Sequence, residues 1–88
     1  MPRGMSRPEL VGLARAVAAA MFERAQRLTP STVKKAQSKA FRVINSADPT
    51  IGTAQHPFAP YSHGVWALAA EGVEQAERAW VPAKQIRR

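Results

Sequence analysis

The chain has 88 residues, of which 13 are Lys or Arg and 6 are Asp or Glu, and it contains no cysteine. That length limits it to one small domain, and the lack of cysteine excludes a disulfide framework, a redox thiol and a thiolate zinc site. Hydrophobic residues make up 45% of the chain, but many of them are alanines, which favour helix and bury little area. We therefore expect an all-α chain without a self-sufficient compact core.

The first predicted helix begins at Ser6 and is stopped by Thr29-Pro30, since the residue before a proline is pushed out of helical geometry. Ser6 and Glu9 have the spacing of a capping box, in which each side chain binds the backbone N–H of the other. Pro8 falls in the first turn, where its missing N–H costs nothing. One apolar face follows the helical spacing: Leu10, Leu13, Val17, Met21, Ala25 and Leu28.

A second helix is predicted over residues 31–44, with Thr29 as its N-cap and Pro30 at its first position. Only about two residues then separate the first two helices, which favours an angled or antiparallel pair. The apolar side of the second helix is narrow, and most of the remaining surface is cationic.

Residues 45–62 contain three prolines and one glycine, which excludes a helix and argues against a central strand. We expect an extended proline-rich arm that lies on a partner, because a structureless link of this length is uncommon inside a compact domain. A third helix is predicted from residue 63 to Val81, where Pro82 stops it. Its two tryptophans either belong to the domain's own core or act as anchors in a partner. The candidate protein-interface residues are Phe58, Tyr61, Trp66 and Trp80.

The chain divides into a basic helical pair (1–44), the arm (45–62) and a C-terminal amphipathic helix with a short basic tail (63–88). Residues 1–44 carry the whole excess charge of +7, while acids and bases balance in residues 45–88. This asymmetry indicates a polyanionic partner, either nucleic acid or an anionic membrane surface, with a solvated basic face as the alternative. The Lys and Arg spacing suits phosphate contacts better than base reading, which favours structured RNA. The candidate RNA-binding residues are Arg24, Arg27, Lys34, Lys35, Lys39 and Arg42.

Residues suited to catalysis are few. No Gly-rich phosphate loop, G-x-S-x-G or H-E-x-x-H motif occurs, so we expect no enzyme, no cofactor and no small-molecule substrate. Asp48, His56 and His63 carry metal-ligand chemistry but lack the spacing of known zinc sites, and we expect no bound metal. The longest uncharged stretch, residues 49–70, contains prolines and glycines, so we expect no transmembrane segment.

The order of several segments resembles a known family. Met21-Phe22 would match the end of that family's first helix, and residues 28–32 would match its proline and threonine turn. Lys34, Lys35 and Lys39 would match the family's basic helix. Residues 56–61 would match its proline and tyrosine segment and residues 71–77 its acidic helix. Together these segments resemble the mitochondrion-specific small-subunit ribosomal proteins numbered thirty-three. The chain departs from that family at Glu23, where a glycine is usual, and lacks the family's double tyrosine and long basic tail.

The resemblance implies a structural component of the mitochondrial ribosome small subunit, located in the matrix. The basic half would hold the rRNA backbone, and the arm and C-terminal helix would hold neighbouring ribosomal proteins. With so little core of its own, the chain would be stable only inside such a large assembly. Two functions of other classes stay open: a soluble accessory subunit of a mitochondrial membrane complex, such as a respiratory complex or ATP synthase, and a small DNA-binding protein.

Overall fold

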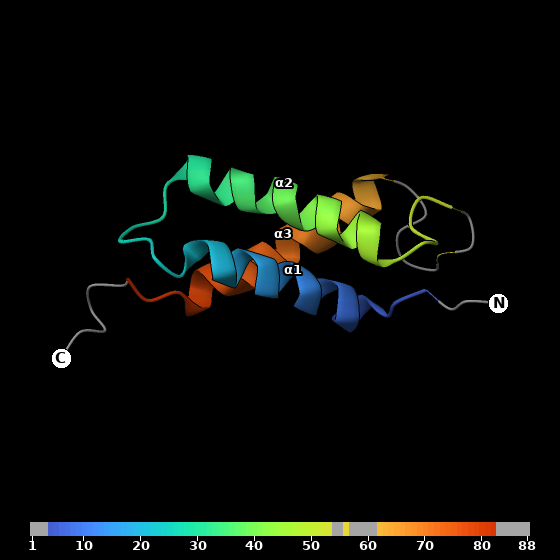
Figure 1. Ribbon diagram of the computed structural model, residues 1–88, viewed down its shortest axis with the longest axis horizontal. Coiled ribbons are helices and arrows are strands. Elements are labelled where there is room, and N and C mark those ends of the chain that lie inside the picture. Colours follow the sequence, from blue (N-terminus) through green and yellow to red (C-terminus); the bar gives the residue numbers. More distant parts are fainter. Residues whose placement is uncertain (1–3, 54–55, 57–61, 83–88) are drawn as a thin grey trace.

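Three helices account for most of the chain in the computed structural model, which describes residues 4–53, 56 and 62–82. They are α1 (Arg7–Phe22), α2 (Pro30–Ala47) and α3 (Ser62–Ala79), and no strand occurs among the described residues. Each helix reverses the direction of the one before, so α1 and α3 run the same way and α2 runs opposite to both (Figure 1). The predicted all-α class is confirmed.

Local capping explains where α1 and α2 begin. The Ser6 hydroxyl accepts a hydrogen bond from the Glu9 backbone N–H at 3.3 Å, and the Glu9 carboxylate accepts one from the Ser6 N–H at 2.7 Å. The predicted capping box is thus present. The hydroxyl of Thr29 accepts from the Thr32 backbone N–H at 3.2 Å and caps α2 as predicted. Both caps satisfy donors that the first helical turn leaves without partners.

The first helix ends earlier than predicted, at Phe22 instead of near Leu28. The carbonyl oxygen of Phe22 accepts hydrogen bonds from the Ala25 backbone N–H at 3.0 Å and from Trp80 Nε1 at 3.1 Å. A contact from the end of α3 therefore satisfies a carbonyl that would otherwise bind the next helical turn. The link to α2 is correspondingly longer than predicted and spans residues 23–29.

The predicted arm is corrected at its start. Residues 45–47 belong to α2, and Asp48 follows as its C-cap. Residues 48–53 form tight turns, with backbone hydrogen bonds from Ile51 N to Asp48 O at 3.1 Å and from Thr53 N to Thr50 O at 3.0 Å. Pro49, the first of the three prolines in the predicted arm, lies in these turns, and Pro57 and Pro60 lie outside the described residues.

The described residues form a compact core, which the composition did not predict, while the expected dependence on a large assembly stays a prediction. One cluster of buried hydrophobic side chains joins all three helices: Leu10, Val11, Ala14, Ala18, Phe22, Ala36, Ala40, Ile44, Val65, Leu68, Ala69, Val73 and Ala76. Alanines bury little area each, but small side chains let helix backbones approach closely. Gly72 shows this most clearly, because a Cβ built on it would lie 2.5 Å from the Ala14 Cβ of α1. The close approach of the helix backbones thus compensates for the small area that each alanine buries.

Candidate nucleic-acid interface

The orientation of α2 decides where its cations lie. Ala36, Ala40 and Ile44 follow one another at four-residue spacing and are fully buried against α1 and α3. Residues on the opposite side of the helix consequently face outward, because successive residues are separated by about 100° around a helix. The exposed cations of α2 are Lys34, Lys35, Lys39 and Arg42.

These four cations surround one open hollow of about 550 Å³ on the outer side of α2. The described residues that line it are Met21, Ser31, Lys34, Lys35, Ser38, Lys39 and Arg42. None of these described residues is acidic. Ser31 and Ser38 add hydroxyl groups that are able to donate hydrogen bonds to an anion. Their spacing of seven residues, two helical turns, places both on the same side as the cations.

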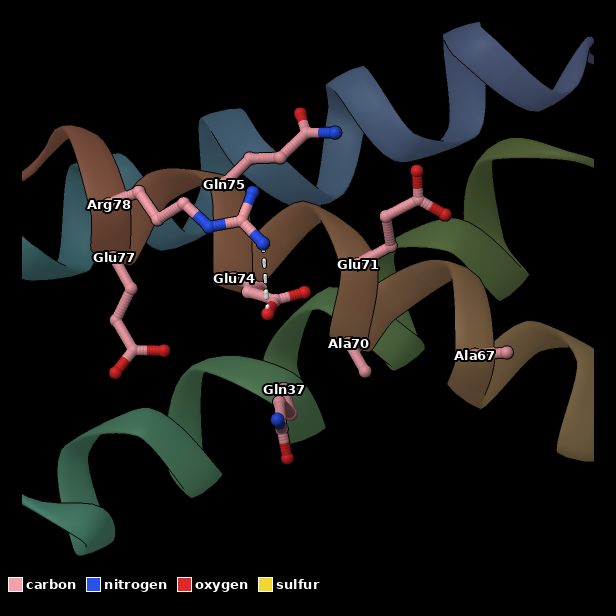
Figure 2. A pocket seen from close by; sticks show the side chains of 8 residues that line it. All are labelled: Gln37, Ala67, Ala70, Glu71, Glu74, Gln75, Glu77 and Arg78. Atoms are coloured by element: carbon pink, nitrogen blue, oxygen red, sulfur yellow. Dashed lines mark ion pairs between the residues drawn. The ribbon is translucent and has the colours of Figure 1, made fainter.

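The four cations make no ion pair with any described residue. Two of the three glutamates of α3, Glu71 and Glu74, do form ion pairs. Figure 2 shows Glu71, Glu74 and Glu77 along α3, where they line a hollow together with Gln37 of α2. The carboxylate of Glu74 lies 3.0 Å from the Arg78 guanidinium. Glu71 is paired with Arg7 of α1. The excess positive charge that is free to attract an anion thus concentrates on α2.

The other two candidate RNA-binding residues lie elsewhere. Arg24 and Arg27 are exposed in the link between α1 and α2, and neither lines the α2 hollow. Arg27 instead lines a separate hollow together with Glu74 and Glu77. The link is longer than predicted, so these arginines are not carried onto the cationic side of α2.

The two described candidates for the protein interface have different surroundings. Trp80 is partly buried against the core and donates to the Phe22 carbonyl oxygen. Trp66 is 40% exposed and stacks on Phe41 of α2, with ring centroids 4.4 Å apart. The remaining two candidates, Phe58 and Tyr61, lie outside the described residues.

Comparisons with protein-family models, with curated proteins and with solved structures found no match to this chain. Within the described residues, none of the helices combines the length and the apolar character needed to span a bilayer.

A buried polar cluster fastens the N-terminal segment to the turn after α2. Asp48 accepts hydrogen bonds from the Met5 N–H at 2.6 Å, from the Thr50 N–H at 2.9 Å and from the Thr50 hydroxyl at 2.7 Å. His56 Nε2 lies 3.1 Å from the same carboxylate, and both side chains are fully buried. Gly4 packs so closely that a Cβ there would meet the Thr50 hydroxyl at 2.8 Å.

Hydrogen bonding outweighs burial in setting the pKa of Asp48. Burial alone raises the pKa of this carboxyl, because the charged form loses water. The hydrogen bonds from Thr50 and Met5, together with the charge interaction with His56, reverse that effect, and the pKa of Asp48 falls below its ordinary value. The carboxylate is thus held charged inside the fold, as a structural tie between distant segments.

The three residues considered as metal ligands are not brought together. Asp48 and His56 are in contact, but His63 is exposed on the first turn of α3. Among the described residues there is no group of three or more His, Cys, Asp or Glu side chains placed to hold a metal ion.

Proposed function

We propose that this chain is a structural RNA-binding protein that holds the phosphate backbone on the outer side of α2. One observation carries the proposal: four exposed cations, none of them ion-paired with a described residue, and two hydroxyls surround a hollow that no carboxylate of the described residues lines. Ammonium, guanidinium and hydroxyl groups are the donors that nucleic-acid-binding proteins direct at phosphate oxygens. The first turn of α2 also contains no acidic residue that would repel a phosphate from the positive end of the helix dipole.

An anionic membrane fits this surface less well. A helix that lies in a membrane interface inserts its apolar side among the acyl chains. The apolar side of α2 is occupied, because Ala36, Ala40 and Ile44 are fully buried in the core. Among the described residues that line the hollow, Met21 of α1 is the only large apolar one. A surface of cations and hydroxyls over a packed helix is better suited to a phosphate backbone that stays in water.

Salt dependence of RNA binding tests the proposal. In the full chain, the triple variant Lys34→Ala, Lys35→Ala, Lys39→Ala should bind a structured RNA more weakly, with a log–log salt slope shallower by about 2 to 3. Arg78→Ala is the matched control, since it removes an exposed cation that is already paired with Glu74. It should leave the slope nearly unchanged. Equal slopes for wild type and the triple variant would refute RNA binding by α2.

The particle we propose, on the resemblance alone, is the small subunit of the mitochondrial ribosome. A tagged chain should then sediment with small-subunit rRNA and lose that sedimentation after RNase treatment. Release by mild detergent without RNase would instead identify a membrane complex. Tighter binding to duplex DNA than to RNA would favour a DNA-binding protein. Either result would contradict the ribosomal assignment.

A further inference from the structure

An aromatic pair lies at the edge of the cationic side of α2. The rings of Phe41 and Trp66 are stacked, with centroids 4.4 Å apart and planes inclined by 14°. Phe41 is partly buried against the core, whereas Trp66 keeps 40% of its surface exposed although Phe41 covers one ring face. Among the described residues, Val81 is the only other large hydrophobic side chain that is exposed to this degree.

Helical geometry places this pair next to the cations. Phe41 directly precedes Arg42, so the two side chains leave α2 about 100° apart, on adjoining sides. Lys34 is seven residues before Phe41, which puts it two turns, or about 10.5 Å, along the same side of the helix. A nucleic-acid strand whose phosphates are held by Lys34 and Arg42 would therefore pass the rings.

The turn of α3 beside the rings does not repel such a strand. Glu71 is the first acidic residue after Trp66, and its carboxylate is already paired with Arg7. Glu77, which lines a hollow together with Lys34, lies at the far end of α3 from Trp66. A polyanion is thus free to approach the aromatic pair from the side of Arg42.

We propose that Trp66, supported from behind by Phe41, is a stacking platform for an unpaired base of the RNA that α2 binds. This inference rests on the proposed function. Aromatic side chains accept any base, because every base presents a flat π face, and stacking adds affinity without reading sequence. Bases inside a duplex are covered by their neighbours, so the platform selects loops, bulges and single strands. The stacked pair holds the indole in place before binding, which lowers the entropy lost on association.

Two RNA probes test the platform with the full chain: a short U-rich single strand and a blunt duplex of equal length. Trp66→Ala should weaken binding of the single strand by about 5- to 100-fold and leave duplex binding nearly unchanged. The salt slope should not change, because stacking releases no counterions. Trp66→Phe should recover most of the lost affinity. Val81→Ala, which truncates the other exposed hydrophobic side chain, should have no effect.

Fluorescence gives a second measurement that does not depend on removing the indole. In a Trp80→Phe variant Trp66 is the only tryptophan, and the single strand should quench its emission while the duplex should not. Equal losses on both probes, or no loss and no quenching, would overturn the platform. If the triple lysine variant still lowers the salt slope, the proposed function survives that failure. If wild type binds neither probe, the proposed function itself fails.

Discussion

Gly72 is predicted to be the position where adding a single methyl group harms the fold most directly. It is buried in α3, and a Cβ built on it lies 2.5 Å from the Ala14 Cβ, 2.6 Å from the Val11 carbonyl oxygen and 2.7 Å from the Arg15 backbone nitrogen. Two of these atoms belong to the backbone of α1, so no side-chain rotation relieves the contact. In Gly72→Ala the two helices must move apart, which loosens the core along their whole interface.

Two opposing contributions, helix propensity and overpacking, determine how Gly72→Ala changes the free energy of unfolding. Alanine is favoured over glycine inside a helix by about 1 kcal/mol. Overpacking a close contact typically costs about 1–3 kcal/mol, and the upper end applies here because the obstruction is backbone. The net loss of stability is then about 2 kcal/mol, which lowers the melting temperature of a chain this small by roughly 8–16 °C.

Gly12 provides a matched control with the opposite sign. It lies inside α1, and a Cβ there would meet only the end of the Arg15 side chain, at 3.8 Å. Gly12→Ala should therefore gain helix propensity without a clash and raise the melting temperature by about 4–8 °C. Far-ultraviolet circular dichroism during heating and urea titration measures both variants. A Gly72→Ala protein as stable as wild type, beside a stabilised Gly12→Ala, would refute the close approach of α1 and α3.

Three further substitutions test the hydrogen bonds that cap the helices or connect them to other segments. Because the folded-state pKa of Asp48 is depressed, its stabilisation is full above the unfolded pKa of about 4 and is lost as pH falls through the lower folded pKa. Asp48→Asn should thus be less stable than wild type at neutral pH, with the difference shrinking in acid urea titrations. Thr29→Ala removes the α2 cap and should cost about 1 kcal/mol, with faster amide exchange at Thr32. Trp80→Phe keeps the packing but removes the bond to the Phe22 carbonyl oxygen; urea unfolding should show a loss of about 1 kcal/mol, and no change would contradict that bond.

Local signals were sufficient to predict how the helices begin. Ser6 with Glu9, and Thr29 with Pro30, act within a single turn of chain, and the structure contains both caps. Helical spacing also placed Lys34, Lys35, Lys39 and Arg42 together, since their separation along one helix follows from its geometry. For these features the neighbouring residues decide the conformation, so no knowledge of the fold was needed.

Contacts between distant segments decided the rest. The end of α1 at Phe22 depends on Trp80, 58 residues later in the chain, and the turn after α2 depends on Asp48 binding the backbone of Met5, 43 residues earlier. The compactness of the core also could not be predicted from composition, because a count of large aliphatic side chains does not show how closely α1 and α3 approach at Ala14 and Gly72. The position of Arg27 beside α3, and the stacking of Phe41 on Trp66, likewise required the packing of three helices. Sequence periodicity fixes which side of a helix a residue occupies, but only the tertiary structure decides what that side meets.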